Sequence, residues 1–381
     1  MKLKKVAVIT FHRAHNFGSV LQTYALQEFV RQIGKEGGTE IDYSVIDLHT
    51  RVQENLYNVF KPWNCLQNVV KNILTIPHAK ALRIKHRKFT QFVNERFRLT
   101  KRYINEEEIK NDPPEADYYI SGSDQIWNVR AKDFSSAYFL DFVPKGKKIS
   151  YAASLGPMMI NWADYDAESC ASALSEYAAV SVREQGSADN VAAISDVKCD
   201  IHVDPTLLLS AAEWRKVQSD ANYHDGQYIL LYCLEPTKEQ LAMADAVSRK
   251  LNLPIVVLRY NNKNDMFNHF VKKYDSGPED FLAYIDHAAL VLSSSFHGTA
   301  FSLIYHKPFY VFNGMKDNRI ASILTKTKMT ERSLESVSDT ERVTLEAPDA
   351  QVIEKLLNEE QQKSRLYIEE ALEIRKTNQL N

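Results

Sequence analysis

The sequence predicts an α/β protein with two Rossmann-like domains, each built on a mainly parallel sheet. Short apolar runs alternate with amphipathic helical stretches along most of the chain, which is the pattern of strand–helix–strand units. The chain has 381 residues, enough for two domains with a core each. Most apolar runs end in a polar or glycine-containing loop, and parallel sheets bind their ligands beyond these carboxyl ends.

The first domain is expected to span residues 1–220 and to begin with a strand, a helix and a second strand. Residues 6–10 form a short apolar run, residues 19–33 place apolar side chains at helical spacing, and residues 41–48 return as a strand. Such a unit implies a parallel sheet with a right-handed crossover. Four more strands are expected, at 117–120, 148–153, 177–182 and 201–203.

A helical insertion is expected within this domain, at about residues 52–103. Its apolar stripe consists of Phe60, Trp63, Leu66, Val70, Ile73 and Leu74. Residues 80–102 hold nine Lys or Arg against the single acid Glu95. One interpretation is a helical pair with a solvated charged face. The other is a peripheral contact with an anionic membrane or a pyrophosphate-linked lipid, to which each basic residue near the surface contributes about 1 kcal/mol.

The second domain is expected to span residues 221–345, after a polar, turn-prone stretch at 220–226. Its strands are expected at 227–233, 254–259, 288–293 and 308–312, and its helices at 237–251, 278–285 and 299–306. Residues 346–381 are expected to form a C-terminal helical segment, with a long charged helix over 349–376.

Composition excludes several classes of protein. The 47 Lys and Arg against 49 Asp and Glu give a net charge of −2, without the positive field of a dedicated nucleic-acid binder. The four cysteines lie far apart, without a Cys-x-x-Cys pair, which fits a reduced cytoplasm. No apolar run approaches 18 residues, so we expect a cytoplasmic protein whose membrane contact is at most peripheral, at the inner face.

The motifs of several enzyme classes are also missing. The sequence has no Gly-x-x-x-x-Gly-Lys-Ser/Thr loop, no Gly-x-Gly-x-x-Gly fingerprint and no His-Glu-x-x-His. Asp164 and Asp166 form a single Asp-x-Asp, whereas metal sites usually need three or four converging ligands. We therefore expect no metal site and no cofactor.

Polar side chains follow two strands of the first domain. Asn16 and Gly18 precede the first helix, where free N–H groups favour an anion or sugar hydroxyls; the alternative is a plain turn. Arg183 follows an apolar strand and could grip a phosphate or carboxylate in two-pronged fashion, or pair with Glu184.

A third strand of this domain ends in a polar tip, which contains Ser121, Ser123, Asp124 and Gln125. Trp127 follows it with a flat face suited to stacking on a sugar. Asp124 could serve as an acid or base, or could cap the next helix.

The sharpest feature lies in the second domain, between an expected buried strand and a helix start. It contains Ser295, His297, Gly298 and Thr299. Histidine, with an ordinary pKa of about 6.5, exchanges protons near neutral pH, and a glycine lets a ligand approach closely. We expect His297 to act in catalysis or anion binding, against the alternative of a structural histidine.

These motifs, taken in order, resemble the polysaccharide pyruvyl transferase family. The similarity runs from about residue 5 to about residue 324. Its motifs are Asn-Phe-Gly-Ser-Val-Leu-Gln at 16–22, Gly-Ser-Asp-Gln-Ile-Trp-Asn at 122–128, Ser-Tyr-Ala-Ala-Ser at 150–154, Ser-Val-Arg-Glu at 181–184, Asp-Pro-Thr-Leu-Leu at 204–208 and Ser-Phe-His-Gly-Thr at 295–299.

The resemblance implies a GT-B-like pair of domains facing a cleft, with the acceptor on the N-terminal side and phosphoenolpyruvate on the C-terminal side. It implies transfer of the pyruvyl group onto two hydroxyls of a sugar, in a capsular, exo- or cell-wall polysaccharide precursor that could be lipid-linked. A cyclic ketal forms and phosphate is released. His297 and Asp124 would then be the acid and base, in either order, and Arg183 would grip phosphoenolpyruvate.

One departure from the family pattern bears on the donor site. A branch of the family has Arg-Leu-His where this chain has Ser295-Phe296-His297, so a phosphate-binding arginine is missing. The resemblance then requires another cation, with Arg259 and Arg319 as candidates. Two alternatives stay open: a GT-B-type glycosyltransferase that uses a nucleotide sugar, and a non-catalytic member that binds glycans.

Overall fold

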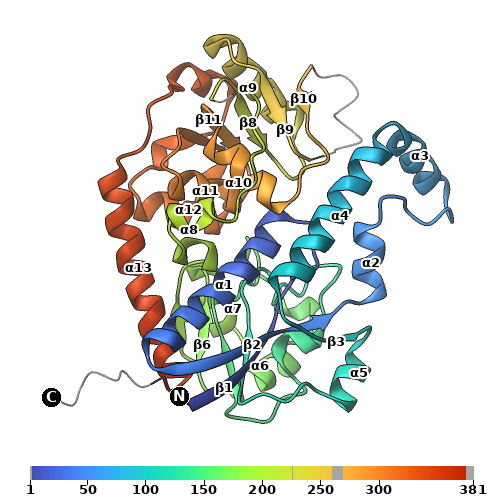
Figure 1. Ribbon diagram of the computed structural model, residues 1–381, viewed down its shortest axis with the longest axis vertical. Coiled ribbons are helices and arrows are strands. Elements are labelled where there is room, and N and C mark those ends of the chain that lie inside the picture. The colour runs from blue at the N-terminus through green and yellow to red at the C-terminus, as the bar shows by residue number, and fades with distance from the viewer. Residues whose placement is uncertain (1, 225, 260–268, 375–381) are drawn as a thin grey trace. The chain divides into compact units, whose positions relative to one another are not determined.

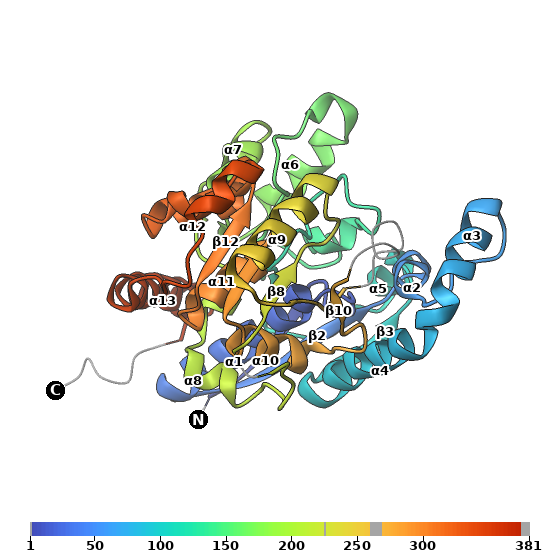
Figure 2. The ribbon, with the colours of Figure 1, turned by 90° about the horizontal axis from the view of Figure 1, so that it is seen from above.

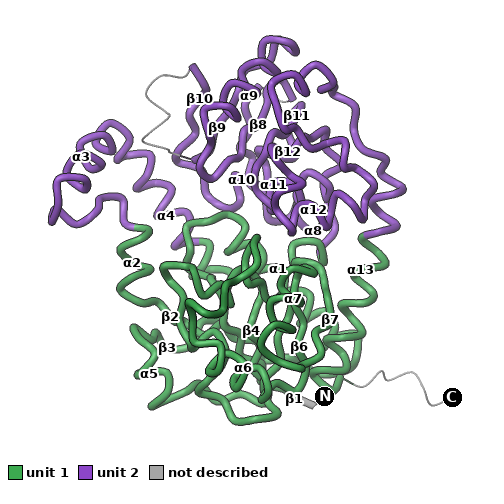
Figure 3. Tube along the Cα trace, turned by 180° about the vertical axis from the view of Figure 1, so that it is seen from behind, with its two compact units in different colours: residues 1–57, 92–208, 357–381 green, residues 58–91, 209–356 purple. Residues whose placement is uncertain are grey.

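The chain divides into two compact units in the computed structural model, which describes residues 2–224, 226–259 and 269–374 (Figure 3). Unit 1 comprises Met1–Tyr57, Phe92–Leu208 and Leu357–Asn381, and unit 2 comprises Asn58–Gln91 and Leu209–Leu356. The division at 208/209 lies close to the boundary expected at 220/221. However, residues 58–91 belong to unit 2, and the C-terminal helical segment is shared between the units.

Unit 1 is built on a parallel sheet with the strand order β3-β2-β1-β4-β5. Figure 1 labels β1, β2 and β3 of this sheet. Its central strand β1 buries Val6, Ala7, Val8 and Ile9 completely, as a strand covered on both faces must. The strands are β1 (Lys2–Ile9), β2 (Thr39–Leu48), β3 (Leu99–Tyr103), β4 (Tyr118–Ser121) and β5 (Lys148–Ser150). β6 (Val180–Val182) and β7 (Cys199–Ile201) pair with each other in parallel. Single bridges join this pair to the segment that contains β5.

The helices of unit 1 begin with α1 (Phe17–Glu36), which the Asn16 side chain caps by accepting a hydrogen bond from the Gly18 N–H. Gly38, with φ +68°, follows its end. The others are α2 (Arg51–Tyr57), α5 (Glu106–Asn111), α6 (Ala167–Ser175) and α7 (Gln185–Ala192). α13 (Ala350–Ala371) contributes its C-terminal part to this unit.

Unit 2 carries a second parallel sheet, in the order β10-β9-β8-β11-β12-β13. Its strands are β8 (Ile229–Tyr232), β9 (Ile255–Val257), β10 (Val271–Lys272), β11 (Leu290–Ser293), β12 (Phe309–Phe312) and β13 (Ser333–Leu334). Its helices include α8 (Ala211–Arg215), α9 (Lys238–Leu251), α10 (Pro278–Asp286), α11 (Phe296–Ile304) and α12 (Asn318–Lys326). Two parallel α/β sheets confirm the predicted fold class, while the predicted cleft stays a prediction.

The expected helical insertion ends earlier than predicted. α3 (Leu66–Thr75), the single turn η1 (Ile76–His78) and α4 (Ala79–Arg96) follow α2 (Figure 2), but residues 99–103 form strand β3 of the first sheet. Residues 99–103 form a strand because the edge of β2 would otherwise have N–H and C=O groups without partners, and the segment forms hydrogen bonds with them despite its charged side chains. In unit 2, Ala81 and Leu82 of α4 pack against the core around β8, β9 and β11.

The end of the C-terminal segment also differs from the prediction. The predicted helix over 349–376 is observed as α13, which ends at Ala371, and residues 375–381 lie outside the described residues. Across the part of the chain that the structure describes, no helix is both long and apolar enough to cross a bilayer.

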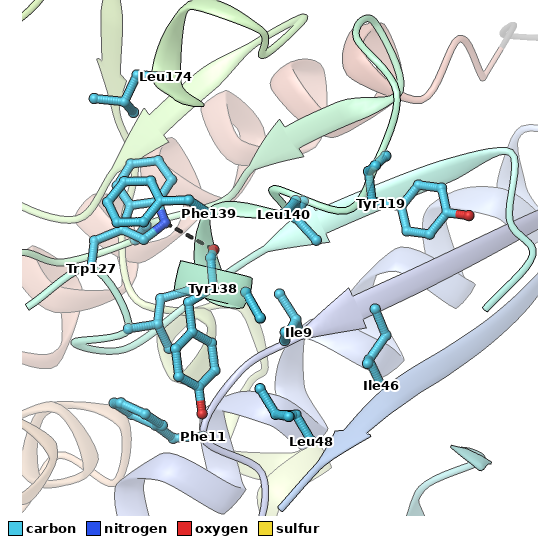
Figure 4. Packing of buried hydrophobic residues seen from close by; sticks show 14 of the residues in the cluster. Ile9, Phe11, Ile46, Leu48, Tyr119, Trp127, Tyr138, Phe139, Leu140 and Leu174 are labelled. Carbon is cyan, nitrogen blue, oxygen red and sulfur yellow. Dashed lines mark hydrogen bonds between the residues drawn. The ribbon is translucent and has the colours of Figure 1, made fainter. Parts of the chain in front are cut away.

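Trp127 lies in the core of unit 1, where the sequence predicted a surface for stacking on sugars (Figure 4). Its ring has no exposed area, stacks on Phe139 at 5.1 Å between centroids, and donates its indole N–H to the carbonyl of Tyr138 at 3.1 Å. Ser121 is equally buried, and its hydroxyl donates to the same carbonyl at 2.5 Å. Both residues therefore support the sheet and do not offer groups to a ligand.

We predict that Trp127→Ala lowers the free energy of unfolding by about 3–5 kcal/mol, because it removes a fully buried aromatic ring and leaves a cavity. Urea denaturation followed by circular dichroism measures the loss. Trp63→Ala is the matched control, since Trp63 is 62% exposed and its removal should cost at most about 0.5 kcal/mol. Equal losses for the two variants would contradict the placement of Trp127.

Candidate functional site

The loop after β4 is held in place by the close approach of two backbone segments. Gly122 has φ +132°, and a Cβ atom there would lie 2.2 Å from the carbonyl oxygen of Tyr151, so only glycine fits. Ser123 turns inward: its hydroxyl donates to the carbonyl of Ala152 at 2.7 Å, and its N–H donates to the Gln22 side chain at 3.2 Å. Ser123 thus builds the loop, where the sequence predicted a substrate contact.

Asp124 is the residue that this loop presents, and its carboxylate accepts hydrogen bonds from two directions. Oδ2 accepts the Ser19 hydroxyl at 2.5 Å, from the first turn of α1, and Oδ1 accepts the N–H of Gln125 at 2.9 Å. Asp124 does not cap the next helix, which was the alternative. Gln125 is half-buried, and its side-chain oxygen accepts from Asn128 at 3.1 Å.

Arg183, directly after β6, lies at the centre of three carboxylates. Its Nη1 lies 2.7 Å from Asp204 and 3.8 Å from Asp124, and its Nε lies 3.3 Å from Glu184. Burial alone would lower the pKa of Arg183, but the three carboxylates raise it above its ordinary value. The side chain of Arg183 is 2% exposed. Arg183 therefore pairs with Glu184, which was the alternative considered from the sequence, and also with Asp204 and Asp124.

The acids around Arg183 are themselves fixed by hydroxyl and N–H donors. Glu184 accepts the Ser154 hydroxyl at 2.7 Å and the Ser187 hydroxyl. Asp204 accepts the N–H and the hydroxyl of Thr206, at 3.0 and 2.8 Å. A continuous polar network thus joins the carboxyl ends of β4, β5, β6 and β7 with the start of α1. We call it the Arg183 network: Ser19, Asp124, Ser154, Arg183, Glu184 and Asp204.

A second ionic cluster lies at the carboxyl ends of β1, β2 and β3, and the sequence did not predict it. Arg13 binds Asp47 with two nitrogens, at 2.5 and 2.7 Å, while His12 lies 3.1 Å and Arg102 lies 3.5 Å from the same carboxylate. Burial would raise the pKa of Asp47, but Arg13 and His12 hold it well below its usual range. Burial, Arg13 and Arg102 lower the pKa of His49 to about 4, so its imidazole is neutral at pH 7.

One sequence signal could have led to this cluster. His12 and Arg13 directly follow the first expected strand, and Asp47 and His49 stand at the end of the second. Neighbouring parallel strands bring such ends together, so the placement could be derived. Arg102 could not be found this way, because β3 was expected to be helical.

In unit 2, the predicted motif forms the end of β11 and the first turns of α11. Ser295 is the N-cap residue, and its carbonyl accepts the N–H and the hydroxyl of Thr299, both at 3.1 Å. Thr299 is fully buried and thus serves the helix. A Cβ atom on Gly298 would lie 2.3 Å from the Ser293 hydroxyl oxygen, so this glycine allows α11 to pack on β11 and not, as predicted, a ligand to approach.

His297 stands in the first turn of α11, at the end where the helix dipole favours negative charge. It is 6% exposed, and its ring lies edge-on to Phe296 at 5.4 Å between centroids. This places His297 at the carboxyl edge of the second sheet, as expected.

The two cations proposed to replace the missing arginine differ in their surroundings. Arg319 binds Asp317 with two nitrogens, at 2.9 and 2.5 Å, so its charge is met within α12 and its cap. Arg259 is exposed, just beyond β9, beside Lys85, whose Nζ lies 3.4 Å from the carbonyl of Leu258. Burial and the charge of Arg259 lower the pKa of Lys85 to about 7. These observations favour Arg259.

The Asp-x-Asp tripeptide serves local structure. Asp166 caps α6 by accepting the N–H of Ser169 at 3.0 Å, and Asp164 accepts from the Asn161 side chain at 2.9 Å. Over residues 2–224, 226–259 and 269–374, no three histidine, cysteine or acidic residues gather closely enough to hold a metal ion.

A comparison with protein-family models shows which family these motifs define. The model described as polysaccharide pyruvyl transferase matches residues 16–314, which is most of the chain. The chain belongs to the polysaccharide pyruvyl transferase family. Like the family it is a transferase, and the resemblance inferred from the sequence motifs is confirmed. A search among curated proteins finds no match.

Several solved structures are also similar to this chain. One is an S. aureus protein, MnaA, solved with UDP: 11% identity, 98% of each chain covered, TM-score 0.49. Another is a UDP-GlcNAc 2-epimerase from Neisseria meningitidis bound to UDP-GlcNAc, with 11% identity, 98% of this chain and 100% of that chain covered, and TM-score 0.48. A third is AviGT4, a glycosyltransferase of avilamycin A biosynthesis, with 11% identity, coverages of 97% and 98%, and TM-score 0.46.

We predict that His49 titrates with a pKa of about 4, measured by NMR of its ring protons. Because this value lies below the ordinary value for an unfolded chain, about 6.5, His49 stabilises the fold above pH 6.5. That stability is lost as the pH falls from about 6.5 to about 4. Arg102→Gln should raise the pKa of His49, and an unchanged titration would contradict the role of Arg102.

We predict that Arg183→Met lowers the free energy of unfolding by about 3–5 kcal/mol, since it leaves three buried carboxylates without their cation. Urea denaturation at pH 7 measures the loss. Adding Asp204→Asn should recover part of it, because one unpaired charge is then removed. If the two changes were simply additive, the carboxylates would not depend on Arg183.

Proposed function

We propose that the protein transfers the pyruvyl group of phosphoenolpyruvate onto two hydroxyls of one sugar in a polysaccharide precursor. The observation that carries this proposal is the Arg183 network. Five motifs of the family, separate in sequence, meet in hydrogen bonds and ion pairs around Asp124 and Arg183. A reactive carboxylate needs such fixed surroundings to keep its orientation.

The reaction needs a proton donor, a proton acceptor and a cationic site for the donor. A proton added to the methylene carbon of phosphoenolpyruvate makes its second carbon electrophilic, and a sugar hydroxyl attacks that carbon and loses its proton. The phosphate then leaves, taking up one proton, and the second hydroxyl closes the ring and loses its own. One proton is consumed at carbon and two come from the hydroxyls, so the products are the cyclic ketal and hydrogen phosphate.

Charge assigns the two substrates to different sheet edges. Around Arg183, three carboxylates face one guanidinium, so this part of the edge repels a highly charged anion and suits neutral hydroxyls. We assign the acceptor sugar to it, with Asp124 as the proton acceptor. Asn16 and Gln125, both half-buried, stand at the same edge as hydrogen-bonding partners for the sugar.

Phosphoenolpyruvate is assigned to the carboxyl edge of the second sheet. There His297 and the N–H groups of α11 follow β11, and Arg259 and Lys85 stand at the end of β9. Only β8 separates these strands, which puts them about 10 Å apart, a span that long basic side chains can reach across. Helix N-termini and cations together bind phosphate, and His297 is the proton donor. Transfer then requires the two substrates to meet.

We predict that His297→Ala lowers kcat for phosphate release from phosphoenolpyruvate by about 10²–10⁴, the usual contribution of general acid catalysis. The assay uses a panel of galactose, mannose and glucose acceptors, free and lipid-linked. His269→Ala is the control, since His269 is an exposed histidine of unit 2 whose ring lies 3.6 Å from Asp245. Unchanged turnover in His297→Ala would remove this residue from the mechanism.

The increase in melting temperature that each candidate donor produces distinguishes the proposed pyruvyl transfer from the two alternative functions. Stabilisation by phosphoenolpyruvate supports the proposal, and stabilisation by a UDP-sugar alone would favour a glycosyltransferase. Sugar binding without phosphate release from any acceptor would indicate a non-catalytic, glycan-binding member. Arg259→Gln should weaken the shift with phosphoenolpyruvate, whereas Arg319→Gln should not.

A further inference from the structure

The helix α3 is amphipathic, but it turns its polar side inward. Asn72 and Thr75 are its buried residues. The Asn72 side chain accepts the N–H of Lys61 at 2.8 Å and donates to the carbonyl of the same residue at 2.9 Å, which ties the helix to the chain before it. The Thr75 hydroxyl donates to the carbonyl of Lys71 at 2.8 Å. These bonds set the rotation of the helix.

The apolar side of α3 consequently faces outward. Leu66, Val70 and Ile73 recur at the i, i+4 and i+7 spacing of one helix face and are 78%, 49% and 55% exposed. Trp63, just before the helix, and Ile76, just after it, are also exposed, at 62% and 57%. Apolar side chains gathered on one exposed face mark a binding surface. We call these five residues the α3 apolar face.

The surroundings of this face are strongly basic. Residues 58–91 contain five Lys and two Arg and no acidic residue. The helix α4 adjoins α3 (Figure 1). Lys71 on α3 and Lys80, Arg83 and Arg87 on α4 are exposed. An apolar helix face flanked by exposed cations is the signature of a helix that lies in the interface of an anionic bilayer, and tryptophan is enriched at that depth.

The basic segment predicted for this role, residues 80–102, is less suited to it. Arg98 pairs with Asp42, Lys101 with Asp112, and Arg102 with Asp47, all within unit 1. In unit 2, Lys88 pairs with Asp280 at 2.6 Å. Four of the nine basic residues in 80–102 therefore form ion pairs with carboxylates of the protein itself.

We propose that the α3 apolar face docks the protein onto an anionic lipid surface. Leu66, Val70 and Ile73 enter the boundary between headgroups and acyl chains, and Trp63 anchors one end. The exposed cations Lys71, Lys80, Arg83 and Arg87 contact the anionic headgroups. A second copy of the chain would not satisfy this surface, because it would bring the same exposed cations, those of Lys71, Lys80, Arg83 and Arg87, against one another.

The test is flotation of the full chain with vesicles of phosphatidylcholine mixed with phosphatidylglycerol. We expect binding that falls as salt is raised and that is weak on phosphatidylcholine alone. Leu66→Glu combined with Ile73→Glu should reduce the partition coefficient at least about tenfold. Leu366→Glu is the matched control, since Leu366 is 56% exposed on α13, and it should leave binding unchanged.

A measurement on the unaltered face complements the variants. Trp63 fluorescence should shift to the blue on binding vesicles, and Trp63→Phe should abolish that shift. Absence of binding to phosphatidylglycerol vesicles would overturn the proposal, as would equal binding of the Leu66→Glu, Ile73→Glu variant. It would also be overturned by a dimer in light scattering that this variant dissociates. None of these outcomes depends on the donor or the acceptor of the proposed reaction.

Discussion

The ion pairing of Arg183 with three carboxylates is the interaction on which the first unit's candidate site depends. The side chain of Arg183 is 2% exposed and has lost most of its hydration, and the carboxylates of Asp124, Glu184 and Asp204 replace that water. Each carboxylate belongs to a different loop, so their common cation fixes the ends of β4, β6 and β7 relative to one another. The orientation of Asp124 follows from that constraint.

The Arg183 network of the first sheet and the end of β9 in the second sheet differ in charge. The Arg183 network has more negative than positive groups, whereas the end of β9 presents Lys85 and Arg259 together, close enough that Arg259 lowers the pKa of Lys85. A further positive region surrounds His49, whose pKa is lowered by burial and by Arg13 and Arg102. The proposed reaction would use the contrast between the Arg183 network and the end of β9, with the neutral hydroxyls of the sugar at the network and the phosphate of phosphoenolpyruvate at the end of β9.

The helix α3 shows how a local hydrogen bond can override a hydrophobic pattern. Read from sequence, Leu66, Val70 and Ile73 form a stripe that should face a core. In the structure, the oxygen and the nitrogen of the Asn72 side-chain amide both form hydrogen bonds with the backbone of Lys61. Burial of those bonds leaves the stripe on the outside. The same pattern that indicates a core helix is then available for binding a lipid surface.

The sequence by itself determined the alternation of strands and helices, the parallel sheets, the family, and the strand ends at which the candidate site residues lie, because apolar periodicity and loop motifs are local properties. It located Asp124, Arg183 and His297 at strand ends. It did not determine the direction of the side chains. Trp127, Ser121 and Ser123 turned inward, Gly298 proved to be a packing contact, and β3 joined a sheet despite its charges. Those outcomes depend on neighbours distant in sequence, and only the tertiary structure brings such neighbours into contact.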